Sequence, residues 1–292
     1  MNYDVRLQLA YDYEIPVSGG HHLVRIMPQS LAGLQRVVAA SLSFDPSPAE
    51  RIDRPDFFGN ISTAIRYAES HETLVVELIA RVAVDRPATM LDVSPNLAEI
   101  GREIDSIQSL DPESPHHFRA PSPRVPVDPA ITAYAAESVD GSRSVVAVVT
   151  ELTERIYRDF AYDADATLVD TPVREAFELR RGVCQDFSHL MIAGLRGLGV
   201  PAAYVSGFLR TIPPKGRERL VGADAMHAWV RVWCGVDTGW LEFDPTNAVQ
   251  ASNDHIVIGH GRDYGDISPI VGVVKTFGKH SSTQEVDVVP LG

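Results

Sequence analysis

The chain has 292 residues, of which 45% are hydrophobic and 22% are charged, and its formal net charge at pH 7 is −13. These values predict a soluble globular protein with a large core and about two domains. Nucleic-acid binding is disfavoured, because it needs clusters of Lys and Arg that this acidic chain lacks. A membrane-spanning helix is also disfavoured, since no stretch approaches the roughly 18 consecutive apolar residues that it needs.

The first residues alternate polar and apolar side chains and do not form a basic segment followed by an apolar one. A signal peptide needs both of these segments and a cleavage site with small residues. We therefore expect a cytoplasmic protein with no membrane partner and no nucleic-acid partner.

Residues 1–110 are predicted to form a β-rich domain. The clearest strand is residues 72–85, in which Leu74, Val76 and Leu78 recur at a period of two. Several short strands separated by Gly, Pro, Asn and Asp are typical of an antiparallel, sandwich-like unit.

Residues 111–129 contain six prolines. This composition is typical of an extended linker, which would join two domains. The alternative is a rigid crossover on the surface of one domain.

Residues 130–292 are predicted to form a second domain in which helices precede strands. Apolar residues recur at helical spacing over 145–160, and another helix is expected to begin near Cys184 and to end before Pro201. Three predicted strands follow that proline. Together with the N-terminal region, this order of elements predicts an α+β fold.

Cys184 follows a glycine-containing turn at the predicted start of a helix. Backbone N–H groups at a helix N-terminus and a nearby imidazolium both stabilise a thiolate, which is the reactive form of cysteine. Cys184 is therefore a candidate nucleophile, although a free cysteine is more often an inert core residue. The other cysteine, Cys234, follows a predicted strand and is expected to be a core or turn residue.

His227 and Asp244 are the candidate base and the carboxylate that orients it. His227 begins one predicted strand, and Asp244 ends the next strand 17 residues later. Two short strands joined by a turn would bring these side chains together, and the carboxylate would stabilise the imidazolium that forms beside a thiolate. The three residues predict a Cys–His–Asp triad that needs no metal or organic cofactor.

Several blocks of sequence, taken in order, resemble the bacterial transglutaminase-like superfamily. They are "GVCQDFSHLMIAGLRGLGVPAAYVSGF", "HAWVRVW", "GWLEFDPTN" and "HIVIGHGRDYGDISPI". The segments "YDYEIPV", "LVRIMP" and "LVVELIARVAV" also resemble the β-rich N-terminal domain of this subgroup. The resemblance implies a papain-like second domain, with helices and an antiparallel sheet, and it places Cys184, His227 and Asp244 on the catalytic positions of the family.

The resemblance also implies acyl transfer from a protein or peptide amide through a thioester. Members of the family include cross-linking enzymes, peptidases and peptide N-glycanase-type amidases, so the acceptor of the acyl group stays open. We favour hydrolysis over cross-linking, because water is always present and no amine-specific pocket is evident. The sequence does not predict the oligomeric state.

Four further residues are candidates for the substrate cleft. Gln185 could donate a hydrogen bond to a developing oxyanion, although the backbone N–H of Cys184 is the safer donor. Trp229 could form a wall of the cleft or could pack in the core. Arg262 and Tyr264 lie in a polar loop that could form the rim of the cleft, or could be structural with Arg262 paired to an aspartate.

Two other functions are considered. A non-catalytic peptide-binding module would keep the fold, but the intact triad argues against it. A zinc-dependent hydrolase would have to bring ligands together without the paired spacing that is typical of zinc sites. Its candidate ligands would be Cys184, Cys234, His189 and His227.

Overall fold

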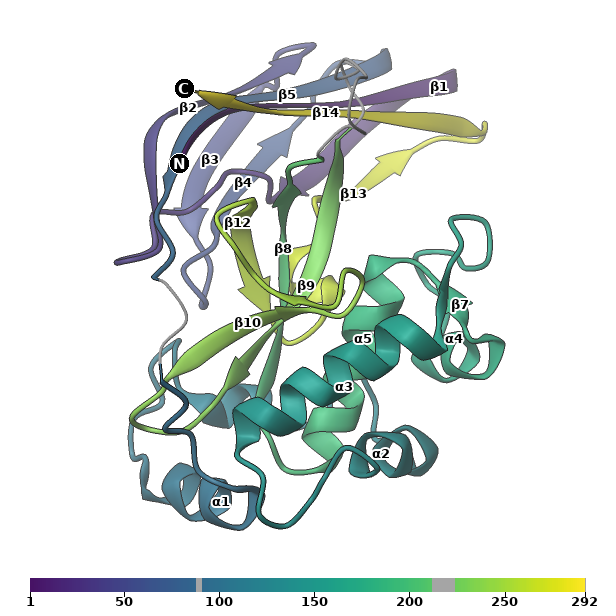
Figure 1. Cartoon of the computed structure of the whole chain (residues 1–292). Coiled ribbons are helices and arrows are strands. Elements are labelled where there is room, and N and C mark those ends of the chain that lie inside the picture. Colours follow the sequence, from purple (N-terminus) through teal and green to yellow (C-terminus); the bar gives the residue numbers. More distant parts are fainter. Residues whose placement is uncertain (88–90, 212–223, 292) are drawn as a thin grey trace, which may run out of the picture.

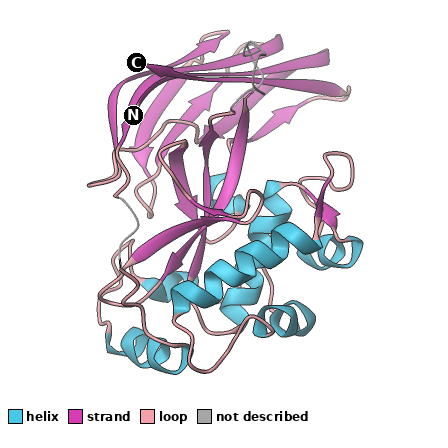
Figure 2. Cartoon of the chain, in the orientation of Figure 1, coloured by secondary structure: helices cyan, strands magenta, loops and turns pink. Residues whose placement is uncertain are grey.

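The computed structural model of the chain describes residues 1–87, 91–211 and 224–291. The fold is α+β, as predicted. A curled antiparallel sheet lies at one end, the helices lie at the other end, and a second sheet lies between them (Figure 1; Figure 2). None of the described helices is long and apolar enough to cross a membrane.

The N-terminal sheet is built around one long, bent strand. Its strands are β1 (Asn2–Val24), β2 (Gln35–Asp45), β3 (Glu50–Pro55), β4 (Ile61–Arg66) and β5 (His71–Val84), in the order β2-β5-β1-β4-β3. The first half of β1 pairs with β5 and its second half pairs with β4, and the register shifts between Asp12 and Val17. The alternating pattern of Leu74, Val76 and Leu78 places these residues in the core, as predicted.

The last strands of the chain return to this N-terminal sheet. Both β13 (Ile270–Lys275) and β14 (His280–Leu291) pair with β1, from Asn2 opposite Leu291 to Val24 opposite Ile270. The predicted division of the chain placed all residues after 129 in the second domain. The structure differs for residues 270–291, because β13 and β14 pair with β1 of the N-terminal sheet. Strand patterns do not show which strands pair when the partners lie this far apart in the sequence.

The second domain packs helices against one face of an antiparallel sheet. The sheet has the order β11-β10-β9-β8-β12. Its strands are β8 (Ala202–Leu209), β9 (Ala225–Trp233), β10 (Trp240–Asp244), β11 (Val249–Gln250) and β12 (His255–Gly261). The helices are α1 (Leu97–Ser106), η1 (Pro115–Phe118), α2 (Pro129–Ala136), α3 (Val145–Asp159), α4 (Val173–Leu179), α5 (Cys184–Gly197) and α6 (Tyr264–Ile267). Two short parallel strands, β6 (Ala161–Tyr162) and β7 (Arg181–Gly182), lie beside α4 and α5.

The helix α5 is the central element of this domain. It lies between the other helices and the sheet, and its residues 185–196 are buried (Figure 1). Ala228, Val230 and Val232 on β9 belong to the same hydrophobic core as α5. The period-two alternation of a strand places these three residues on one face of β9, whereas Trp229 packs with Val205 and Val257 in a separate cluster.

The proline-rich residues 111–129 pack on the second domain and do not extend as a free linker. Phe118 is fully buried, and its ring lies 5.3 Å from that of Trp240. The carbonyl of Phe118 accepts a hydrogen bond of 2.9 Å from Arg196 Nε on α5. Ile100 and Ile104 of α1, which the prediction assigned to the N-terminal domain, lie in the same core as α5. This packing corresponds to the alternative of a surface crossover.

Side-chain amides from the N-terminal domain join the two domains along β12. Gln35 exchanges two hydrogen bonds of 2.8 Å with the backbone of Val257. Asn60 exchanges two others, of 2.8 and 2.9 Å, with the backbone of His260. Because β12 is the edge strand of its sheet, its outer N–H and C=O groups would otherwise lack partners. The amides satisfy these groups and fix the N-terminal domain on the second sheet.

Candidate active site

Cys184 is the first residue of α5, so the predicted start of this helix is confirmed. The carboxylate of Asp186, in the first turn, accepts the Val183 N–H at 2.9 Å and the Thr167 hydroxyl at 2.6 Å. A Cβ atom at position 182 would lie 2.6 Å from that carboxylate, so the turn before the nucleophile requires Gly182. Cys184 itself is a free, partly exposed thiol.

His227 and Asp244 lie together, as their positions on neighbouring strands predicted. The Nε2 atom of His227 lies 2.8 Å from Asp244 Oδ2, and the Cys184 side chain lies close enough to the imidazole to change its pKa. Since Asp244 occupies Nε2, the other ring nitrogen, Nδ1, is the one available to Cys184. Burial by itself would lower the pKa of His227, but the hydrogen bond to Asp244 and the interaction with Cys184 raise it to about 10. This environment favours the imidazolium at neutral pH.

Asp244 is fully buried, and five hydrogen-bond donors surround its carboxylate. Its Oδ1 accepts the backbone N–H groups of Thr246 and Asn247, at 2.9 and 3.3 Å. Its Oδ2 accepts from the side-chain amide of Asn247 at 2.6 Å, from His227 at 2.8 Å and from His255 at 3.2 Å. Burial alone would raise the pKa of Asp244, but these bonds hold it well below its usual range. The carboxylate is therefore ionised and cannot rotate without losing partners.

His255 and Asn247 are parts of the site that no sequence pattern had singled out. Asn247 belongs to the "FDPTN" block, where it is a turn residue close to Asp244, so a side-chain bond back to the aspartate could have been considered. His255 carried no such signal. The Ser252 N–H donates to its Nδ1 at 3.1 Å, so its Nε2 carries the proton that is donated to Asp244.

Among the described residues, His227, Asp244 and His255 form the group that could hold a metal ion. One ligand atom each from His227, Asp244 and His255 lies within 4.8 Å of the others. Two histidines and a carboxylate are a donor set that suits several transition metals. Cys234 and His189, which the zinc alternative invoked, are not in this group. Cys234 is fully buried near the Val232 carbonyl, and His189 accepts the Tyr264 N–H at 3.2 Å.

Trp229 packs in the core beside the candidate base, His227. It is fully buried, and its ring is stacked on that of His227 at 6.0 Å between centroids. Its indole N–H donates to Glu242 at 2.7 Å, and Glu242 forms a buried ion pair with Arg86 at 2.8 Å. Of the two roles considered for Trp229, a wall of the cleft and core packing, this burial supports core packing. The ring packs with Val205 and Val257, in a cluster separate from the core around α5.

Gln185 is buried, and its side chain is directed at the loop before α4. One of the two N–H groups of its Nε2 donates to the carbonyl of Val169 at 2.9 Å, which orients the amide toward that loop. The backbone N–H groups of the first turn of α5 are the donors that this helix offers at its N-terminus.

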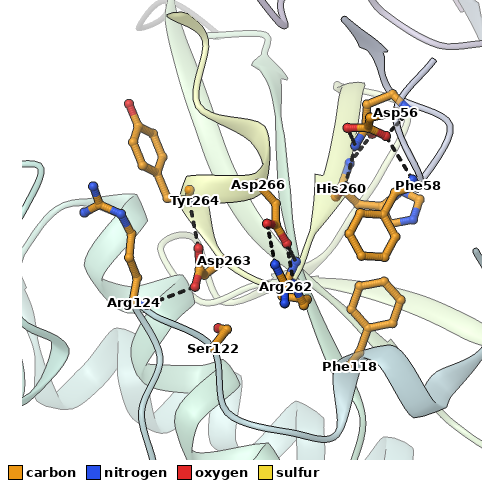
Figure 3. A network of polar contacts seen from close by, with 12 residues as sticks. Asp56, Phe58, Phe118, Ser122, Arg124, His260, Arg262, Asp263, Tyr264 and Asp266 are labelled. Atoms are coloured by element: carbon orange, nitrogen blue, oxygen red, sulfur yellow. Dashed lines mark hydrogen bonds and ion pairs between the residues drawn. The ribbon is translucent and has the colours of Figure 1, made fainter. Parts of the chain in front are cut away.

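Arg262 and Tyr264 lie at opposite sides of the loop that leads into α6 (Figure 3). Arg262 pairs with Asp266 through its backbone and its guanidinium, at 2.8 to 2.9 Å, as the structural alternative expected. It lines a separate cavity of about 510 Å³, together with Arg25 and Asp56. Tyr264 lies partly buried near Arg124 and packs, like Cys184, against the second-domain core. Its ring also lies 6.2 Å from that of the buried Tyr204.

Comparisons with known proteins agree with this architecture. Residues 132–245 match the family model of the transglutaminase-like superfamily, and residues 3–83 match that of the bacterial transglutaminase-like N-terminal region. The uncharacterized protein Rv2569c of Mycobacterium tuberculosis is 40% identical over 264 residues, which cover 88% of this chain and 83% of the relative. The uncharacterized protein ML0607 of Mycobacterium leprae is 30% identical over 289 residues, which cover 96% of each chain.

A solved structure has the same fold. A crystal structure from Cytophaga hutchinsonii, named as a proposed cysteine protease, superposes with a TM-score of 0.75 at 22% identity. The alignment covers 100% of this chain and 91% of the other. The curled N-terminal sheet and the second domain are therefore arranged as in a known protein.

Proposed function

Because the chain belongs to the transglutaminase-like superfamily, we propose that it is a cysteine-dependent amide hydrolase or acyl transferase. Cys184 would be the nucleophile, His227 the acid–base group and Asp244 the residue that orients it. The observation that carries this proposal is that one imidazole, His227, is hydrogen-bonded to Asp244 and lies next to the side chain of Cys184, the residue that begins α5. Nucleophile, base and orienting carboxylate in one chain of contacts are the arrangement that covalent catalysis needs.

The first half-reaction would form a thioester. The Cys184 thiolate attacks the carbonyl carbon of an amide, and N–H groups at the start of α5 stabilise the negative charge that develops on the oxygen. When the C–N bond breaks, the His227 imidazolium gives its Nδ1 proton to the departing amine. The products of this step are a free amine, an acyl group on sulfur and a neutral imidazole.

The second half-reaction would release the acyl group. Water or a second amine attacks the thioester while His227 takes a proton from it, and the C–S bond breaks to return the Cys184 thiolate. Asp244 stays ionised through the whole cycle, because its five donors stabilise the carboxylate. We favour water as the acceptor and a protein or peptide amide as the donor.

Labelling with iodoacetamide, read by mass spectrometry, tests this proposal. We expect one carbamidomethyl group on Cys184 near neutral pH, while the fully buried Cys234 stays unmodified. Cys184→Ala should abolish the labelling, and the matched control Cys234→Ala should keep it. Unselective labelling, or none, would overturn the proposal and favour a non-catalytic peptide-binding module.

A metal-dependent hydrolase is a second candidate, and the ligand group formed by His227, Asp244 and His255 favours it. Metal analysis of the purified protein separates the two functions. Activity that needs a stoichiometric metal ion and survives Cys184→Ala would support the metal, whereas activity that resists chelators and is lost in Cys184→Ala would support the thiol.

A further inference from the structure

The loop between β6 and α4 is anchored to the first turn of α5. The Thr167 hydroxyl donates to Asp186 at 2.6 Å, and the Gln185 amide donates to the carbonyl of Val169 at 2.9 Å. Gln185 and Asp186 directly follow Cys184 in the chain. Residues 167–169 therefore border the candidate nucleophile.

Further hydrogen bonds fix the same loop. The Leu168 N–H donates to the Thr171 hydroxyl at 2.8 Å, and the Thr171 N–H donates to the carbonyl of Leu168 at 3.0 Å. Arg124 adds a second donor to the carbonyl of Val169, at 2.6 Å. Since the backbone of Leu168 and the carbonyl of Val169 are held by partners, the loop is ordered before any substrate binds. Such preorganisation lowers the entropic cost of binding.

Two apolar side chains of this ordered loop point into solvent. Leu168 is 76% exposed and Val169 is 54% exposed. Tyr162, which is 62% exposed, lies on β6 opposite Gly182, two positions before Cys184. Burial and then the negative charge of Cys184 raise the pKa of Tyr162, which agrees with a position close to the thiol. Leu168 and Val169 are adjacent exposed apolar residues on an ordered segment, which is a feature of binding surfaces.

We propose that Tyr162, Leu168 and Val169 form an apolar rim that binds a large aliphatic or aromatic side chain next to the carbonyl that Cys184 attacks. The inference rests on the proposed function and adds the class of substrate to it. The rim selects an acyl donor with an apolar residue at the reacting carbonyl, because that side chain leaves water when it packs on Leu168 and Val169. A glycine or a charged residue at this position gains no such contact.

Paired electrophiles measure this selectivity directly. The chloromethyl ketones of N-acetyl-leucine and N-acetyl-glycine present the same reactive group to Cys184 with and without an apolar side chain. We expect the leucyl reagent to label Cys184 roughly tenfold faster, since burying a side chain of this size on a partly open surface is worth about one to two kcal/mol. Iodoacetamide, which has no such side chain, reports the intrinsic reactivity of the thiol.

Substitutions locate the selectivity on the rim. The double variant Leu168→Ser, Val169→Ser should lower the leucyl-to-glycyl ratio at least threefold and leave the iodoacetamide rate unchanged. Tyr162→Ser should also lower the leucyl-to-glycyl ratio, and it tests the rim independently because Tyr162 lies on β6 and not on the loop. The matched control is Phe277→Ser, because Phe277 is an apolar residue that is even more exposed and lies in the turn between β13 and β14, and it should change neither quantity.

The two proposals fail in different ways. If iodoacetamide does not label Cys184 in the unmodified protein, the proposed function is wrong. If that labelling is normal, but the leucyl-to-glycyl ratio is near one or is the same in the rim variants, the apolar rim is wrong and the proposed function stands.

Discussion

The two sides of the candidate site are built in opposite ways. On the acid–base side, Asp244 is fully buried among five donors, and His227 stacks on the buried ring of Trp229. On the nucleophile side, Cys184 is partly exposed, and Leu168 on the neighbouring loop exposes its side chain to solvent. In the proposed function, the buried side would set the rate of the chemistry and the exposed side would select the substrate. Substitutions on the buried side should therefore lower kcat for every substrate alike.

The largest effect is expected for Asp244→Asn. An amide NH2 group in this position would face the donors that now surround a carboxylate, and it could not stabilise the His227 imidazolium. We expect kcat for a leucyl peptide p-nitroanilide to fall roughly 10⁴-fold, as for the Asp→Asn change in a serine-protease triad. Asp266→Asn, at the exposed pair with Arg262, is the control and should change kcat by no more than about twofold. Equal losses in the two variants would contradict the assignment.

The pH dependence should differ between two kinds of leaving group. Because the pKa of His227 is raised to about 10, the imidazolium persists through neutral pH and loses its proton only as the pH rises through that value. Turnover of the anilide needs this proton for the departing amine and should fall about tenfold per pH unit above pH 10. Acylation by a p-nitrophenyl ester needs no such proton and should not fall. Parallel pH profiles for the two substrates would show that His227 is not the acid.

The same shift predicts how stability depends on pH. A histidine has an unfolded pKa of about 6.5, so the raised value in the folded protein stabilises the fold fully below that pH. The contribution disappears as the pH rises through about 10. His227→Gln should therefore remove part of the decline in stability between neutral pH and pH 10, which denaturant unfolding at several pH values would measure.

A smaller effect is expected at His255, which acts through Asp244 as a positioning residue. His255→Leu removes one donor from the carboxylate and should lower kcat roughly tenfold with little change in KM, since hydrogen bonds to charged groups are worth about 1.5 to 3 kcal/mol. His255→Gln can place an N–H group near the position of Nε2 and should retain most of the activity. If His255→Gln and His255→Leu lower kcat equally, the hydrogen bond to Asp244 is not the contribution of His255 to activity.

The smallest effect is expected for Trp229→Phe. This change removes the indole N–H that donates to buried Glu242, although Arg86 still pairs with that carboxylate. We expect the free energy of unfolding to fall by about 1–3 kcal/mol. Trp240→Phe removes the hydrogen bond from the Trp240 indole N–H to the exposed carbonyl of Glu113, and it should lower the free energy of unfolding by less. Urea unfolding of both variants checks the order, and a larger loss for Trp240→Phe would contradict it.

The sequence predicted the parts of the site whose signal is local. Cys184 lies after a glycine at a helix start, and His227 and Asp244 lie at the ends of consecutive strands, so spacing and residue type were sufficient to bring them together. Core packing was one of the two roles predicted for Trp229. The alternation of β9 agrees with it, because it places Trp229 on the face opposite Ala228 and Val230.

The parts that were missed depend on contacts between distant segments. His255 reaches Asp244 only because the chain crosses from β11 to β12, on the far side of the sheet. The pairing of β14 with β1 joins the two ends of the chain, and no pattern within either strand names its partner. Proline content likewise predicted an extended linker at 111–129, whereas Phe118 and Val125 bury that segment on the second domain. Tertiary packing decided each of these cases.

The most direct test of the account is to trap the acyl group on the enzyme. The protein is mixed briefly with p-nitrophenyl acetate, quenched in acid and digested, and the peptides are identified by mass spectrometry. The account predicts a single acetyl group on the peptide that contains Cys184, removable by hydroxylamine as a thioester is, present in Cys234→Ala and absent in Cys184→Ala. An acetyl group found elsewhere in the chain, or a protein that stays unacylated, would contradict the assignment of Cys184 as the nucleophile.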